Sequence, residues 1–381
     1  MHEARAVKNV YNVIKYGAIA DGKTDISQAI LKAWDQACHS KGTNVLLIPR
    51  RTFMSRQVAL KGPCNGPIHF TVRGVLLAPT DLSSLHLNPW ISFQYIDRLT
   101  INGGGKLNGQ GPSAWPYNDC SRNPKCFQLP VSVRMDFLTH SQIRNITLID
   151  SKSAHLTIFG CKNLKIKNIQ ISAPGDSPNT DGIDIGGSQN IQILDSQIGT
   201  GDDCISLGPG SKQINVSNIN CGPGHGLSIG SLGKSLNEEE VTGVTIRNCI
   251  FNGTTNGVRI KSWAPSYPGS VSDVTYDSIQ VINVQNPINI DQNYCPSGNC
   301  PEAASSVKIS NVKFKEIWGS SASKIAVSLQ CSKSIPCQEI ELNDINLVYY
   351  GGGHGGSSCS NAYGAAYGKQ IPFSCLSRRA T

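Results

Sequence analysis

Apolar and polar residues alternate in short runs along most of this chain. The segment 164–171, Leu-Lys-Ile-Lys-Asn-Ile-Gln-Ile, shows the pattern clearly. Such alternation places every second side chain on one face of a strand, whereas a helix repeats its apolar positions every three to four residues. The pattern therefore predicts an all-β protein made of many short strands.

The runs also form a weak internal repeat, in which each β-branched strand carries Asn or Asp near one fixed place. The residues at this place are Asn145, Asn168, Asp195, Asn218, Asn248, Asn311 and Asp344. The spacing begins at roughly 23 residues and drifts to about 33, which is the range of solenoids. Two or three strands per repeat, joined by Gly, Asn and Ser turns, fit one coil of a right-handed parallel β-helix, whose stacked coils share one apolar core. A β-sandwich does not explain a repeat sustained over so many units.

Two segments depart from the strand pattern. Residues 25–38 place Ile26, Ala29, Ile30, Ala33 and Trp34 at helical spacing, which predicts an amphipathic helix capping the N-terminal end of the solenoid. From Cys331 onward the chain is rich in Gly, Ser and Cys, which predicts a loop-like, disulfide-tied cap over 331–381. No linker interrupts the chain, so we expect one catalytic domain over 1–381, with the solenoid over about 12–330.

Composition and charge narrow the class of partner. The net charge is +8 without any long Lys/Arg run, which suits an acidic polymer as partner. Nucleic acid is disfavoured because zinc-finger spacing, an RNP-like strand and a basic helix are all missing from the sequence. No apolar run is long enough to span a membrane. We expect a soluble monomer.

Fourteen cysteines without a C-x-x-C pair argue against zinc and for disulfides in an oxidising compartment. The close pairs are Cys204/Cys221, Cys295/Cys300, Cys331/Cys337 and Cys359/Cys375. Glycosylation sequons at Asn145, Asn215 and Asn252 point the same way. The first residues lack the apolar segment of a signal peptide, which a mature or re-engineered N-terminus would explain. We expect a secreted protein of the extracellular space and cell wall.

Four short motifs in the middle of the chain carry candidate chemistry. They are Asn179-Thr180-Asp181-Gly182, Gly201-Asp202-Asp203, Gly224-His225-Gly226 and Arg259-Ile260-Lys261. Asp181 and Asp202 lie about one coil apart, as do Asp203 and His225, and residues one coil apart stack at roughly 4.8 Å. Because Arg259 and Lys261 are two residues apart on a strand, they face the same side. The spacing predicts one exterior patch of three carboxylates, an imidazole and two cations.

Such a patch has the groups that cleavage of an acidic polysaccharide requires. One carboxylic acid must protonate the leaving oxygen while a second carboxylate handles water or attacks carbon. Crowded carboxylates raise the pKa of at least one of them, which keeps an acid available near neutral pH. The two cations would bind a substrate with one carboxylate per sugar.

The four motifs, in this order and spacing, resemble the polygalacturonases of glycoside hydrolase family 28, from about Asn12 to Cys375. The segments 172–178 and 224–231 are similar to the plant branch. The resemblance implies that Asp202 is the general acid and that Asp181 and Asp203 hold and deprotonate the attacking water, with His225 tuning their protonation. It also implies substrate contacts from Asn179, Arg259, Lys261 and Tyr294, inversion at the anomeric carbon, and no metal or other cofactor. The substrate would be polygalacturonate, the backbone of pectin.

Several alternatives remain open at this stage. Close carboxylates alone would indicate a retaining mechanism, against the inversion that the resemblance implies. The segments 206–210 and 263–269 are similar to the exo-acting, pollen-type branch, which favours an exo mode releasing galacturonate over an endo mode. Rhamnogalacturonan or xylogalacturonan hydrolysis, a Ca²⁺-dependent pectate lyase and a non-catalytic β-helix adhesin are the other hypotheses.

Overall fold

A computed structural model describes residues 8–81, 89–118, 128–296, 298, 300, 303–353 and 355–378. The chain divides into two compact units, which are described separately below. The first unit comprises residues 1–183 and 191–197, and the second comprises residues 184–190 and 198–381. Strands β14 (Ile183–Gly186) and β15 (Gln189–Gly199) contain the points of division.

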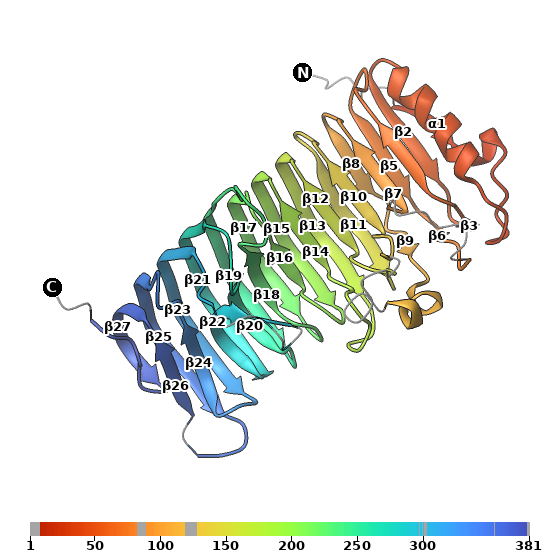
Figure 1. Ribbon diagram of the computed structural model, residues 1–381. Coiled ribbons are helices and arrows are strands. Elements are labelled where there is room, and N and C mark those ends of the chain that lie inside the picture. The colour runs from red at the N-terminus through yellow and green to blue at the C-terminus, as the bar shows by residue number, and fades with distance from the viewer. Residues whose placement is uncertain are drawn as a thin grey trace, which may run out of the picture. The chain divides into compact units, whose positions relative to one another are not determined.

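The first unit consists of parallel strands in two sheets (Figure 1). The long sheet runs in the order β1 (Lys8–Asn12), β2 (Thr43–Ile48), β5 (Ile68–Val72), β8 (Leu99–Asn102), β11 (Gln142–Ile149) and β13 (Lys162–Ser172). Alongside it, β3 (Thr52–Met54), β6 (Val75–Leu77) and β9 (Lys106–Asn108) pair in turn, and β9 pairs with β11. The second sheet runs β4 (Val58–Lys61), β7 (Ile91–Gln94), β10 (Val133–Asp136) and β12 (Leu156–Phe159).

Helix α1 (Ser27–His39) packs against β1, β2 and β4, at the N-terminal end of this unit (Figure 1). All five residues that the sequence pattern assigned to its apolar face are buried. The Asp25 side chain accepts hydrogen bonds from the backbone N–H of Ser27 and of Arg56, which fixes the start of the helix to the strand region. The Cys38–Cys64 disulfide ties its last turn to the chain after β4. The capping helix is confirmed, shifted by one or two residues from the predicted bounds. Short 3-10 helices cover Val13–Tyr16, Gly111–Ser113 and Trp115–Tyr117.

The second unit repeats the two-sheet arrangement. One sheet runs β17 (Lys212–Cys221), β19 (Val241–Asn252), β21 (Gly269–Val284), β23 (Val307–Ser321), β25 (Cys337–Tyr349) and β27 (Ala362–Ile371), all parallel. The other runs β16 (Ile205–Leu207), β18 (Leu227–Leu232), β20 (Asn256–Trp263), β22 (Asn286–Tyr294), β24 (Ile325–Gln330) and β26 (Gly356–Ser360). Both units are therefore built as a parallel β-helix, as the repeat predicts.

Apolar columns form the core between the sheets of each unit. In the second unit one column passes through five consecutive coils: Val216, Ile246, Tyr276, Phe314 and Leu342 are register partners, each at most 1% exposed. Full burial of such a side chain stabilises a fold by about 1.5–3 kcal/mol. The stacked coils thus share one continuous core.

The backbone conformation explains why Asn or Asp recurs at one place in the repeat. Asn145, Asn168 and Asp195 in the first unit, and Asn218 and Asn248 in the second, have φ between 48° and 56°, in the left-handed region. Asn and Asp tolerate this region better than other non-glycine residues because their short side chains hydrogen-bond locally. The repeat therefore marks a bend within each long strand.

Asn311 was assigned to the wrong ladder. The register places Asn311 opposite Asp273, and a 2.6 Å hydrogen bond joins the two side chains. At the bend where the other repeats have Asn or Asp, the register instead places Glu316, opposite Ser278. Glu316 has φ 48° and takes the place that the sequence pattern gave to Asn311. A second column of left-handed residues runs through this sheet, and the two look alike in the sequence.

The predicted loop-like character of 331–381 is also wrong, because β25, β26 and β27 continue both sheets. The four predicted disulfides are present, including Cys331–Cys337 and Cys359–Cys375 within this segment. Cys38–Cys64, separated by 26 residues, was missed because only close pairs were considered. All three sequon asparagines are exposed. Within the part of the chain that is described, no helix is long and apolar enough to cross a membrane.

Candidate active site

Most of the predicted site residues belong to the second unit, on the strands and turns of β16, β18, β20 and β22. They are Asp202, Asp203, His225, Arg259, Lys261 and Tyr294. Asn179 and Asp181 belong to the first unit. The two groups are described in turn, and the assembly of Asp181 with Asp202 stays a prediction.

The turns that hold Asp202 and His225 are shaped by glycine. Gly224 has φ 144°, and a Cβ there would lie 2.7 Å from the carbonyl oxygen of Asp202. Gly226 has φ 87°, and a Cβ there would lie 2.0 Å from the carbonyl oxygen of Asn256. Only glycine fits both places, so the two turns can approach until the backbone N–H of His225 donates to the Asp202 carbonyl at 2.8 Å.

This approach brings the two side chains together as well. His225 Nδ1 lies 2.9 Å from Asp202 Oδ1. The backbone N–H of Asp203 donates to the same oxygen at 2.8 Å, which fixes the Asp202 side chain from a second direction. The Cys204–Cys221 disulfide joins the residue after Asp203 to the end of β17. The Asp202–His225 pair is therefore held by backbone, side-chain and covalent contacts.

Asp203 is buried, with 1% of its side chain exposed, and is surrounded by donors. Arg259 Nη2 and the Ser228 hydroxyl each donate to Oδ1 at 2.9 Å, and Lys261 Nζ donates to Oδ2 at 2.8 Å. Arg259 and Lys261 are themselves 12% and 9% exposed. The sequence reading placed these groups on an exterior patch. On β20, Arg259 and Lys261 flank the core residue Ile260 and so lie on the outer face of the sheet. Asp203 and Lys261 are nevertheless buried there by their neighbours, and Lys261 neutralises the buried carboxylate.

Tyr294 lies beside both cations. Lys261 Nζ is 5.2 Å and the Arg259 guanidinium carbon is 6.0 Å from the centroid of its ring. Trp263, the register partner of Tyr294 on β20, packs edge-on against it at 5.1 Å between centroids. The structure therefore brings the predicted Tyr294 to the predicted cations.

Two further carboxyl groups, those of Asp184 and Asp291, lie near these charged residues and were not predicted from the sequence. Asp184 on β14 hydrogen-bonds to Ser206, and burial together with the charges of Asp203 and Asp202 raises its pKa to about 7. Asp291 on β22 is the register partner of Lys261, and burial raises its pKa against the opposing charges of Arg259 and Lys261. A carboxyl group with a raised pKa is thus present at Asp184, where burial is the largest cause and the neighbouring carboxylates add to it. The sequence feature that could have indicated Asp184 is its position between two isoleucines, which places it on the polar face of a strand.

The pKa values of Asp202 and His225 move in opposite directions. Burial raises the pKa of Asp202, but the hydrogen bond and charge of His225, together with the charge of Lys261, outweigh burial and lower it. The hydrogen bond from Asp202 in turn raises the pKa of His225. The two shifts favour the state in which His225 carries a proton on Nδ1 and Asp202 is ionised, and the two groups titrate as a unit.

A raised carboxyl pKa has a stability consequence that Asp184→Asn tests. A group with a pKa of 3.8 when unfolded and about 7 when folded binds its proton more tightly in the native state. The contribution of this proton to the free energy of unfolding is therefore fully present below about pH 4 and is lost as the pH rises through about 7. We expect the melting temperature of Asp184→Asn to fall less than that of the wild type between pH 4 and pH 8, measured by thermal unfolding. Asp35→Asn, at an exposed position on α1, should fall as the wild type does, and equal slopes for all three proteins would contradict this account.

In the first unit, Asp181 is positioned by a buried histidine. The backbone N–H of His155 donates to the Asp181 carbonyl at 2.8 Å, and Nδ1 lies 3.0 Å from the same oxygen. The Ser151 N–H donates to Nε2, and burial lowers the pKa of His155 to about 4, so the ring is neutral with its proton on Nδ1. Asn179 has φ 52°, and its side-chain oxygen accepts from Asn118. His155, like Asp184 and Asp291, was not predicted from the sequence.

The second unit also contains a group of possible metal ligands. Asp202, Asp203 and His225 each offer one ligand atom, and these atoms lie within 4.8 Å of one another. Their existing contacts disfavour a cation, because Asp203 already bears Arg259 and Lys261, and Nδ1 of His225 faces Asp202. A further positive charge would be repelled by both basic side chains.

A carboxyl group that can donate a proton and a second carboxylate are the groups required to cleave a glycosidic bond. Carried on a parallel β-helix, they define a glycoside hydrolase. The chain belongs to the glycosyl hydrolases family 28, which it matches over residues 38–370.

Individual proteins that are similar to this chain have names consistent with this family. An exopolygalacturonase from Platanus acerifolia is 46% identical over 367 residues, which cover 96% of this chain and 97% of that protein. A polygalacturonase from Nicotiana tabacum is 44% identical and covers 100% of this chain and 95% of that protein. Among solved structures, the endo-xylogalacturonan hydrolase from Aspergillus tubingensis superposes with a TM-score of 0.81 at 22% identity, over 95% of this chain and 99% of that chain. This last likeness concerns the fold.

Proposed function

We propose that this chain is a polygalacturonase, which hydrolyses α-1,4-galacturonide bonds of pectate as a single catalytic domain. The observation that carries the proposal is the contact of Arg259 and Lys261 with the Asp203 carboxylate, beside the Asp202–His225 pair. A substrate with one carboxylate per sugar needs cations next to the acid and base groups. Here β20 supplies two such cations, Arg259 and Lys261. The names of the relatives from Platanus and Nicotiana support the same substrate.

The roles that we propose within the reaction are those that the family resemblance implies. Asp202, one fifth of whose side chain is exposed, donates a proton to the leaving oxygen. Asp203, fixed by three donors, and Asp181 orient and deprotonate the attacking water from the opposite face, which inverts the anomeric carbon. Asp184, whose pKa is raised to about 7, is protonated in mildly acidic solution and there adds no negative charge near the substrate carboxylate. Arg259, Lys261, Tyr294 and Asn179 contact the sugar.

We further propose an exo mode, in which galacturonate is released from a chain end. The name of the Platanus relative, 46% identical over nearly the whole of both proteins, supports it. The five disulfides of the described residues, together with the exposed sequons, support an extracellular location at the cell wall.

Thin-layer separation of early products from polygalacturonate tests the mode of action. We expect monomeric galacturonate as the first and main product, because an exo enzyme releases one sugar from each end it meets. A ladder of oligomers at early times would establish an endo mode instead. Absence of any new reducing ends would refute the assignment as a polygalacturonase.

A further inference from the structure

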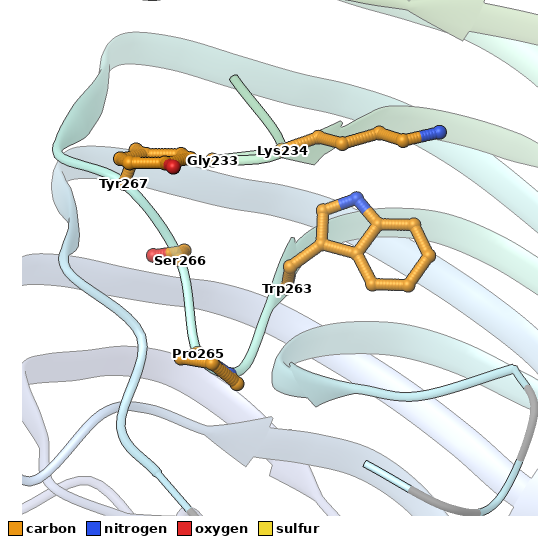
Figure 2. Close-up of a pocket in the computed structure, with 6 residues that line it drawn as sticks. All are labelled: Gly233, Lys234, Trp263, Pro265, Ser266 and Tyr267. Atoms are coloured by element: carbon orange, nitrogen blue, oxygen red, sulfur yellow. The ribbon is translucent and has the colours of Figure 1, made fainter. Parts of the chain in front are cut away.

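A pocket of about 390 Å³ lies in the second unit, between the turn after β18 and the end of β20. It is lined by Gly233, Lys234, Trp263, Pro265, Ser266 and Tyr267 (Figure 2). None of these residues has a role in the reaction described above. The volume falls within the range of pockets that hold small molecules.

Hydrogen bonds hold both walls of the pocket in place. The carboxylate of Glu238 accepts from the backbone N–H groups of Gly233 and Ser235, at 2.6 and 2.8 Å, and so clamps the turn on either side of Lys234. The N–H of Tyr267 donates to the Gly233 carbonyl at 2.8 Å, which joins the two walls. The backbone N–H of Ser306 donates to the Ser266 hydroxyl at 2.7 Å. The pocket is therefore preformed.

The lining combines an aromatic surface with a positive charge. Lys234 Nζ lies 5.9 Å from the centroid of the Trp263 ring, and Figure 2 shows the lysine side chain passing the indole on the side of its ring nitrogen. The Trp263 N–H is shielded from solvent and finds no acceptor among the described residues. Two donors, one of them charged, thus meet beside a flat apolar ring. An anionic group accepts hydrogen bonds from both donors and supplies the acceptor that the shielded N–H lacks.

The pocket continues directly from the catalytic cluster. Trp263 follows Lys261 by two positions on β20, across an irregularity in the strand register that places Trp263 opposite Tyr294. Its ring packs on Tyr294, whose own ring lies beside Lys261 and Arg259. A chain of sugars that places one carboxylate near Lys261 would place a neighbouring sugar at Trp263.

We propose that Trp263 and Lys234 form a further subsite of the binding groove, which holds a neighbouring galacturonate of the substrate chain. The apolar face of the sugar ring packs on Trp263, and its carboxylate accepts from Lys234 and, after a change of the lysine rotamer, from the indole N–H. The subsite selects for a free carboxylate, because a methyl ester loses the charge that pairs with Lys234. This inference rests on the proposed polygalacturonase activity.

The test compares galacturonate oligomers of two lengths. A dimer spans only the cleaved bond, whereas a trimer also reaches the pocket. We expect Lys234→Ala to lower the ratio of kcat/KM on the trimer to kcat/KM on the dimer about 5- to 10-fold, the size of one partly exposed charge-assisted contact of about 1 kcal/mol or slightly more. The loss should appear mainly in KM, and Lys234→Arg should restore most of it.

Two controls make the result specific. Lys369→Ala removes the same charge from an exposed position on β27 and should leave the ratio unchanged. With a carboxyl-reduced, neutral trimer, Lys234→Ala should bind as tightly as the protein with Lys234, measured by calorimetry in an Asp202→Asn background. If the wild type cleaves both oligomers and the ratio is the same in Lys234→Ala, the subsite is refuted while the activity stands. If the wild type cleaves no galacturonate oligomer, the activity itself is refuted.

Discussion

Asp202→Asn should fold normally and lose roughly a thousand-fold or more in kcat on polygalacturonate, because it removes the group that we propose protonates the leaving oxygen. The amide keeps the shape of the carboxyl group and can still accept from the Asp203 N–H. Since one fifth of the Asp202 side chain is exposed, the core is unaffected. Reducing-end assays give kcat, and thermal unfolding checks the fold.

The matched control is Asp35→Asn, the same substitution at an exposed position on α1, which should keep wild-type activity. A variant of Asp202 that retains a tenth of the wild-type kcat would show that another group is the acid. Asp184, whose pKa is raised to about 7, would then be the first alternative.

Lys261→Met should lose both activity and stability. The ammonium donates to Asp203 Oδ2 at 2.8 Å where both side chains are more than 90% buried, so its loss leaves one carboxylate oxygen without its cation. Breaking a buried pair in this way costs roughly 3–5 kcal/mol, and the remaining contacts of Asp203 with Arg259 and Ser228 favour the lower end. A carboxylate shifted by an ångström would lower kcat by about 100-fold.

The substrate dependence separates the two roles of Lys261. The fall in kcat should be similar on de-esterified and methyl-esterified polymer, because it arises from Asp203. KM should rise only on the de-esterified polymer, whose carboxylates pair with the cation. Lys369→Met, an exposed replacement of the same size on β27, should change neither. Wild-type kcat in Lys261→Met would contradict the assigned role of the Lys261–Asp203 contact.

Much of the fold could be predicted because it depends on features that recur along the chain. Alternating apolar residues gave the strands, and the Asn or Asp at each bend gave the coil length. Asn311 was misplaced because two columns of left-handed residues run side by side, and only the register distinguishes Asn311 from Glu316. The sheets also continue into 337–371, where Gly and Ser suggested loops, because stacking on preceding coils outweighs local composition there.

The site was predictable as a set of motifs but not as a set of contacts. Spacing by one coil paired His225 with Asp203, and the structure places the imidazole within hydrogen-bond distance of the adjacent Asp202. Spacing could not show that Lys261 and Asp203 are buried against each other, because it predicts the face of a strand and not how far neighbouring side chains cover that face. Asp184 and His155 were missed for a related reason. Their roles depend on burial and on neighbours from other coils.

The central claim is metal-independent hydrolysis of polygalacturonate, and the most direct test follows new reducing ends and ultraviolet absorbance together in the presence of EDTA. We predict that reducing ends form at the same rate with and without chelator, and that absorbance stays flat, because addition of water leaves saturated ends. An elimination reaction would need a divalent ion to acidify the proton beside the substrate carboxylate, and would leave a conjugated double bond that absorbs in the ultraviolet. Activity abolished by EDTA and restored by Ca²⁺, with ultraviolet-absorbing products, would contradict the account.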